Sequence, residues 1–264
     1  MKKIMEYIFI SFLICFSFIY TDKVINIINK KDPLMLEIIN QSDYYEVMSV
    51  NAIIEENTII PGINGKEIDI DKSYNNMKNG GVFREDALIY KTLYPNDILS
   101  NNKDKYIIGG NAKKNEVSII VILNEKDIDK IKSLNNITIF VNHKNLSIEN
   151  IKKIKEHEIY SYGNGGIYDE DILYNDNYLI NRLANNKSKY CLSTKENDAV
   201  IKVCSMNDMY TIIPSIIGGY YDVRNNLANG SIILLENIKD VDVIMRYISS
   251  KGYDIVTLNN LLCE

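Results

Sequence analysis

From residue 116 onward, short apolar runs alternate with segments of helical spacing. Residues 117–123 form a continuous apolar run, which is typical of a strand buried on both faces of a sheet. Residues 127–134 follow with apolar positions at helical spacing, and residues 137–141 form a second buried run. Because strands and helices alternate, we predict a parallel sheet with crossover helices.

The same alternation continues through the second half of the chain. About seven strands within roughly 150 residues favour a small β/α barrel, distorted or incomplete, over an open sheet. The predicted fold class is therefore α/β over residues 113–264. Further strands are expected at 190–192, 210–213, 232–235 and 254–262, and further helices at 148–155, 195–206 and 241–251.

The part before this domain has a different pattern. Between residues 50 and 112, short apolar runs are broken by turn signals, which predicts a small N-terminal α+β extension. The pair Asn64-Gly65 suits a turn with positive φ and predicts a hairpin there. A helix is expected over residues 70–78, with Asp71 as its cap.

The N-terminus carries a membrane-targeting pattern, in which Lys2 and Lys3 precede an apolar run at residues 7–20. The run is shorter than the about 20 residues of a comfortable membrane span, but no small-x-small cleavage site follows it. We therefore predict a membrane-anchor helix at residues 1–22 and a juxtamembrane stalk at 23–49, with the rest of the chain outside the cell membrane. Secretion after signal cleavage, a lipid on Cys15 and a buried helix of a soluble protein are the alternatives.

Composition narrows the classes of function. A formal net charge of -5, without a dense Lys/Arg patch beside aromatic residues, argues against a nucleic-acid partner. The four cysteines do not form a disulfide scaffold at this chain length, and no C-x-x-C spacing suggests zinc. Cys191 and Cys204 either pair across neighbouring strands or remain buried apolar thiols, and the second interpretation is favoured.

The stretch HEIYSYGNGG at residues 157–166 is the most informative motif. Together with residues 136–156 before it, and with NGSIILLE at 229–236 and VDVIMRYISSKGYDIVTLNNLL at 241–262, it resembles the polysaccharide deacetylase family, also called NodB-homology domains. The resemblance covers residues 115–262. It implies a distorted β/α barrel in which a metal ion at the carboxyl ends of the strands activates a water that attacks an acetyl group on a glycan.

The resemblance also identifies the family positions that have changed. The family's first motif is a buried strand that ends in two aspartates, but the matching strand here ends at Asn124. The two metal-binding histidines correspond to Tyr162 and Gly166, whereas His157 corresponds to a histidine of the framework. Glu236 stands where a late strand normally ends in the histidine that acts as general acid. We therefore expect no metal, no cofactor and no catalytic residue of the family type.

Six residues would line the mouth of the family's active site. Their aromatic and amide side chains suit stacking on and hydrogen bonding to sugars. Alternatively, they only fill the space that the metal left. The hypothesis is a membrane-anchored extracytoplasmic protein that is catalytically inactive and binds cell-wall glycan or an envelope protein. One alternative is a carbohydrate-active hydrolase or deacetylase with a rebuilt site and Glu236 as its base. Another is an assembly protein of the envelope that uses the barrel as an interaction surface. The six residues are Asn124, Tyr160, Tyr162, Asn164, Tyr168 and Glu236.

Overall fold

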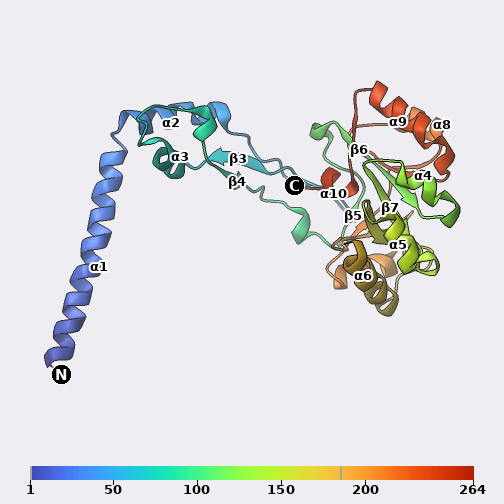
Figure 1. Ribbon diagram of the computed structural model, residues 1–264, viewed down its shortest axis with the longest axis horizontal. Helices are drawn as coiled ribbons and strands as arrows, with labels where there is room; N and C mark the ends of the chain where they lie inside the picture. The colour runs from blue at the N-terminus through green and yellow to red at the C-terminus, as the bar shows by residue number, and fades with distance from the viewer. Residues whose placement is uncertain (1, 185) are drawn as a thin grey trace. The chain divides into compact units, whose positions relative to one another are not determined.

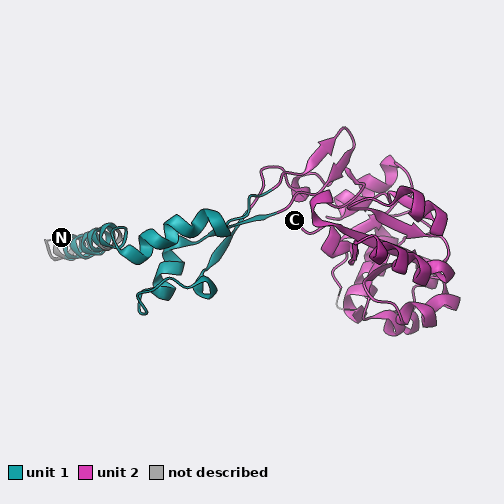
Figure 2. Cartoon of the chain, turned by 90° about the horizontal axis from the view of Figure 1, so that it is seen from above, with its two compact units in different colours: residues 1–49, 64–93 teal, residues 50–63, 94–264 magenta. Residues whose placement is uncertain are grey.

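The computed structural model describes residues 2–184 and 186–264 and forms two compact units, which Figure 2 distinguishes by colour. Unit 1 contains the chain up to Ser49 together with Asn64–Leu93. Unit 2 contains Val50–Ile63 and Tyr94–Glu264, so the chain enters unit 2, returns to unit 1 and enters unit 2 again. Each unit has its own apolar core.

Helix α1 (Lys2–Asn29) covers the segment predicted as an anchor (Figure 1). Its apolar residues are distributed around the helix instead of along one face, and the side chains from Tyr7 to Tyr20 are exposed. Within the described residues, no helix combines the length and the apolar character needed to cross a membrane.

The remainder of unit 1 is a small α+β arrangement with a core formed mainly by two helices. Helix α2 (Pro33–Tyr45) begins where it does because Asp32 accepts a hydrogen bond from Leu34 N at 2.8 Å and proline is favoured in the first turn. Its buried face packs with that of α3 (Ile70–Met77). Strands β3 (Gly65–Ile68) and β4 (Tyr90–Leu93) pair antiparallel.

Two local predictions in this region are wrong. Gly65 does not have positive φ and begins strand β3, where glycine is needed because a Cβ would lie 2.2 Å from Val47 O. The cap of α3 is Asp69, which accepts from Lys72 N at 3.1 Å, whereas Asp71 lies in the first turn. A glycine is needed at position 65, but for close packing in a strand and not for a turn. An aspartate caps α3, but it is Asp69 and not Asp71.

In unit 2 the described strands form two main sheets with parallel strands at their centres. The first sheet has the order β11-β12-β6-β7-β8, with β13 also paired to β6, and all these pairs are parallel. The second has the order β1-β2-β5-β10-β9, in which only the β1-β2 hairpin is antiparallel. The strands are β1 (Ile53–Glu55), β2 (Thr58–Ile60), β5 (Tyr106–Ile107), β6 (Glu116–Ile122), β7 (Ile137–Val141), β8 (Glu158–Ser161), β9 (Tyr190–Leu192), β10 (Tyr210–Ile212), β11 (Ile216–Gly218), β12 (Ile232–Leu235) and β13 (Asp254–Ile255).

The predicted α/β class is confirmed, and five predicted strands lie within one residue of β6, β7, β9, β10 and β12. The expected strand at 254–262 is only β13, because a short helix follows it. No closed barrel is present among the described strands, since the two main sheets share no backbone ladder. The helices are α4 (Ile128–Lys132), α5 (Ile148–Ile154), α6 (Glu170–Ala184), α7 (Asp198–Met206), α8 (Tyr220–Asn226), α9 (Val241–Ser250) and α10 (Leu258–Leu261).

Alternating residues of the central strands fill two apolar layers. Along β6, Val117, Ile119 and Val121 pack into a cluster with residues of α4, α5, α8 and α9, which surround β6 and β7 in Figure 1. Ile120 faces the other way, into a second cluster shared by both sheets. Because both faces of β6 are buried, the strand reads as a continuous apolar run.

Strands β8 and β9 lie side by side without backbone hydrogen bonds between them. Side chains instead form the hydrogen bonds that the N–H and C=O groups at this boundary need. The Tyr168 hydroxyl accepts a hydrogen bond from Leu192 N at 2.9 Å, and it lies 3.3 Å from Ser161 O and 3.2 Å from Leu192 O, either of which can accept its proton. Asn186 Nδ2 donates to Ile159 O at the same boundary. We call this boundary the seam.

Cys191 on β9 and Cys204 on α7 form a disulfide, so the interpretation that favoured two buried thiols is wrong. Strand β9 and helix α7 pack together, and this places the two Cα atoms 6.4 Å apart, within the range that a disulfide spans. Sequence spacing alone does not reveal this approach, because it depends on how α7 packs on the sheet.

We expect Tyr168→Phe to lower the free energy of unfolding by about 1–3 kcal/mol, because it leaves the buried Leu192 N–H without its acceptor. Urea denaturation of both proteins measures this difference. The matched control is Tyr174→Phe on α6, whose side chain is exposed. Equal losses for the two variants would show that the seam does not depend on the Tyr168 hydroxyl.

Candidate functional site at the carboxyl edge of the sheet

The parallel strands β6, β7, β8 and β12 end at one edge of the first sheet. The residues that follow them are therefore neighbours, and in α/β folds ligands bind at this edge. Asn124 comes shortly after β6, Tyr162 directly after β8 and Glu236 directly after β12. This edge is the candidate functional site.

A hollow of about 440 Å³ opens beside the ends of β6 and β12. Its polar lining consists of Asn124, Asp127, Asn145 and Glu236, and its apolar lining includes Leu235. Glu236 is exposed and Asp127 is half-buried, so water can solvate both carboxylates. The hollow thus offers carboxylate and amide groups above an apolar base.

Local hydrogen bonds fix the amides that line this hollow. Asn124 Oδ1 accepts from Lys126 N at 3.2 Å, which caps the turn that begins α4. Asn145 Nδ2 donates to Leu123 O at 3.3 Å. Both amides are therefore held in place before any ligand arrives, and each retains further capacity for hydrogen bonding.

Tyr162 and Gly166 contact one another in the loop after β8. Gly166 N donates to Tyr162 O at 2.8 Å, and Gly166 has a φ of 86°. A Cβ on residue 166 would lie 3.1 Å from Tyr162 Oη. Burial raises the pKa of the Tyr162 phenol, so it stays neutral. The phenol thus occupies the space into which a side chain at position 166 would extend.

The structure separates the six residues that were predicted to face a ligand. Asn124 and Glu236 share the hollow, whereas Tyr162 and the exposed Asn164 lie on the neighbouring loop. Tyr160 is buried between the sheets, and its hydroxyl donates to Glu158. Tyr168 is the buried bridge of the seam.

Comparison with known proteins identifies the fold. No family model matches the chain. Over 92 residues it is 37% identical to the uncharacterized protein YlxY of Bacillus subtilis, a match that covers 34% of this chain and 29% of that protein.

The structure is similar to wild-type BA3943, a CE4 family pseudoenzyme from Bacillus anthracis, with a TM-score of 0.63 and 20% identity over 88% of this chain and 95% of that chain. A BA3943 mutant described as a CE4 family pseudoenzyme with restored enzymatic activity gives a TM-score of 0.63 and 20% identity over 87% and 97% of the two chains. The chain has the fold of the CE4 polysaccharide deacetylases. The resemblance seen in the sequence is confirmed at the level of the fold.

The residues that the sequence resemblance aligned with the family's metal ligands do not have the chemistry to hold a metal ion. Asn124, Tyr162 and Gly166 offer a neutral amide, a neutral phenol and no side chain, whereas a hydrolytic zinc needs about three protein ligands of the histidine or carboxylate type. Throughout residues 2–184 and 186–264, no three His, Cys, Asp or Glu side chains are gathered as a metal site.

Two residues of this edge are absent from the set predicted from the sequence. Asp127 was not among the residues expected to face a ligand, yet it lines the hollow. The buried Asp176 accepts from Ser161 Oγ at 2.6 Å and pairs with His143 Nδ1 at 2.7 Å, and so holds the loops after β7 and β8 to α6. The place of Asp127 depends on the path of the turn between β6 and α4, and nothing in the local pattern marks Asp176.

His157, the first residue of the motif, makes stability depend on pH. Burial lowers its pKa below the ordinary value of 6.5, and the nearby Glu156 only partly opposes this shift. The unfolded chain therefore binds more protons than the folded chain as pH falls through 6.5 toward the folded pKa. Protonation of His157 favours unfolding. It therefore leaves the free energy of unfolding unchanged well above pH 6.5 and lowers it progressively as the pH falls below that value.

We expect the wild-type protein to lose stability relative to His157→Gln as the pH falls from about 7 through the ordinary histidine pKa of 6.5. Denaturation series at several pH values measure the difference between the two free energies of unfolding. That difference should be constant well above pH 6.5 and change as the pH falls below that value. A difference that is independent of pH, or one of the opposite sign, would contradict the lowered pKa of the half-buried His157.

Proposed function

We propose that this chain is a non-catalytic protein of deacetylase-like fold that binds glycan at the carboxyl edge of its sheet. The observation that carries the proposal is the hollow with Asn124, Asn145, Asp127 and Glu236 at the edge where the CE4 fold otherwise holds a metal. Without three ligands of suitable chemistry, the site lacks the means to activate water through a metal ion. Its polar groups are left available for recognition.

The composition of the hollow suits a sugar. Amides donate and accept, and carboxylates accept, hydrogen bonds from hydroxyl groups. Leu123, Leu235 and Ile238 supply an apolar surface for the C–H face of a ring. A volume of about 440 Å³ lies in the range of pockets that hold small ligands. An envelope protein that presents similar hydroxyl and amide groups is the other partner to be tested.

One observation favours a second candidate function, a carbohydrate-active hydrolase with a rebuilt site. Asp127 and Glu236 line the same hollow, and paired carboxylates are the usual acid and base of glycan hydrolysis. Glu236 is exposed to water, however, whereas the general acid of a glycan hydrolase usually lies in an apolar environment. Binding without hydrolysis is therefore the better-supported proposal.

We expect the full chain to bind soluble chitin or peptidoglycan oligomers without added metal, and to release no acetate. Glu236→Gln and Asn124→Ala should each weaken binding by roughly tenfold, because a hydrogen bond to a charged or well-placed group is lost. Isothermal titration with and without zinc measures the glycan affinity, and an acetate assay measures deacetylation. The matched control is Asp129→Asn, an exposed acid on α4 that lies outside the hollow.

The outcomes separate the two candidate functions. Zinc-dependent acetate release would contradict the non-catalytic proposal. Metal-independent hydrolysis that requires both Asp127 and Glu236 would establish the rebuilt enzyme instead. Glycan affinity that is unchanged in Glu236→Gln and Asn124→Ala would place any binding site elsewhere.

We further propose that the chain is held at the cell membrane through α1, with unit 2 outside. The support is the exposed apolar sequence of α1 after Lys2 and Lys3, together with the disulfide between Cys191 and Cys204. Disulfides persist in oxidising compartments and are rare in the cytosol. A basic N-terminal end favours retention of that end in the cytoplasm.

Thiol trapping in intact cells tests this location. We expect Cys191 and Cys204 to resist alkylation until a reductant is added, and the chain to sediment with membranes until detergent releases it. The exposed free thiol of Cys263 serves as the internal control, because it should react in either compartment. A chain in the soluble cytosolic fraction with Cys191 and Cys204 both alkylated would overturn the proposal.

A further inference from the structure

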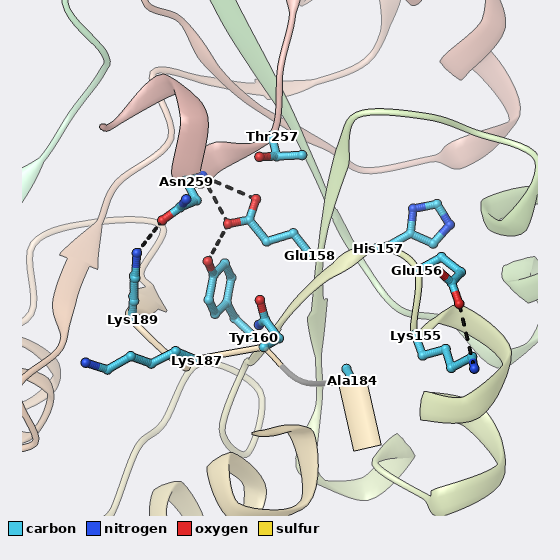
Figure 3. Close-up of a pocket in the computed structure, with 11 residues that line it drawn as sticks. Lys155, Glu156, His157, Glu158, Tyr160, Ala184, Lys187, Lys189, Thr257 and Asn259 are labelled. Atoms are coloured by element: carbon cyan, nitrogen blue, oxygen red, sulfur yellow. Dashed lines mark hydrogen bonds and ion pairs between the residues drawn. The ribbon is translucent and has the colours of Figure 1, made fainter. Parts of the chain in front are cut away.

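A second hollow lies at the opposite, amino-terminal edge of the parallel strands (Figure 3). It is bounded by the turn between α5 and β8, the loop between α6 and β9, and the residues around the start of α10. Its volume is about 410 Å³, comparable to that of the hollow at the carboxyl edge. None of its lining residues belongs to the candidate functional site.

The base of this hollow is a carboxylate whose hydrogen-bonding capacity is used internally. Glu158 Oε1 accepts from the Tyr160 hydroxyl and from Asn259 N at 3.0 Å, and its Oε2 accepts from Thr138 Oγ1 at 2.9 Å and from Asn259 N at 3.2 Å. Figure 3 shows Glu158 between Tyr160 and Asn259. Glu158 thus has little remaining capacity to accept hydrogen bonds from a bound ligand.

Two cations on one side of Glu158 lack an acidic partner. Within the part of the chain that the structure describes, no carboxylate lies within 4.0 Å of the ammonium group of Lys187 or Lys189. Lys189 Nζ donates to Asn259 Oδ1 at 2.6 Å, which positions it and leaves two of its N–H groups available. Lys155 at the other side is paired with Glu156.

The acidic group next along this edge does not neutralise these lysines. Asp208 is bound by Lys103, which is the main cause of its lowered pKa, and Lys187 makes only a smaller contribution. The hollow and its smaller neighbour of about 290 Å³ share Lys187, Lys189 and Asn259 as lining residues. The shared wall therefore brings two lysine ammonium groups and one amide together.

We propose that this hollow binds the phosphoryl group of a small ligand, held by the ammonium groups of Lys187 and Lys189. Lysine is a common phosphate-binding residue in proteins and acts there as a compact point charge. Because Lys155 is paired with Glu156, Lys187 and Lys189 are the cations of this lining that remain available to an anion. The site is independent of the glycan hollow, because the two share no residue.

Titration of the full chain in neutral detergent tests the proposal, with inorganic phosphate, glycerol 3-phosphate and a soluble glycerophosphodiester as probes. We expect at least one probe to bind in the millimolar range or tighter at low ionic strength. Lys187→Gln and Lys189→Gln should each weaken binding by roughly tenfold, and Lys187→Arg should retain most of it. The matched control is Lys202→Gln, an exposed lysine on α7 outside both hollows.

The three probes distinguish free phosphate, a monoester and the diester of a lipid headgroup or polymer. Binding of any of them that depends on both lysines supports the proposal. No binding by any probe, or equal binding by the double variant Lys187→Gln/Lys189→Gln, overturns it. Lysine-dependent binding of acetate or citrate without binding of phosphate also overturns it, because the ligand class would then be a carboxylate. Circular dichroism of each variant shows whether a loss of binding reflects a loss of fold.

Discussion

The arrangement of unit 2 depends on hydrogen-bond partners for the strand edges at which its two sheets meet, because no backbone ladder joins these edges. A strand with an unpaired edge inside a protein exposes N–H and C=O groups that must find other partners. At the seam, the Tyr168 hydroxyl accepts a hydrogen bond from Leu192 N and lies within hydrogen-bonding distance of Ser161 O, and Asn186 donates to Ile159 O. Side chains therefore provide the hydrogen bonds that the neighbouring strand would provide in a closed barrel. The two sheets can share an apolar core because this boundary is satisfied.

The motif at residues 157–166 contains both residues that hold the sheets together and residues that the sequence resemblance aligned with the family's metal ligands. Glu158 ties β8 to Thr138 on β7 and to the first residues of α10, and Ser161 ties β8 to the buried Asp176. These contacts do not involve the positions of the family's metal ligands. The frame can therefore persist when Tyr162 and Gly166 replace those ligands. Motif recognition alone consequently identifies the fold and not the activity.

The central strands could be predicted because their environment is uniform. Strands β6, β7 and β12 are buried on both faces, so their apolar runs indicate them directly. The approach of Cys191 to Cys204 and the role of Tyr168 could not be predicted, because both depend on packing between elements distant in the sequence. Tyr160 and Tyr168 were expected at the mouth because the first lies in the motif and the second just after it, but their burial follows from strand alternation and from the seam. In the hollow, Asn124 and Glu236 could be placed from the strand ends, whereas Asp127 required the path of the turn into α4.

The changes at the carboxyl edge form a physically consistent set. A metal ion neutralises the carboxylates around it, so a site that loses the ion and keeps its acids brings like charges together. Here an amide, Asn124, stands at the end of β6, and the acids that line the hollow are Asp127, half-buried, and Glu236, exposed to water. Tyr162 fills space beside Gly166 with a neutral, apolar ring. The acids at this edge are thus few and at least partly solvated, which agrees with the proposal of a ligand that is recognised through hydrogen bonds.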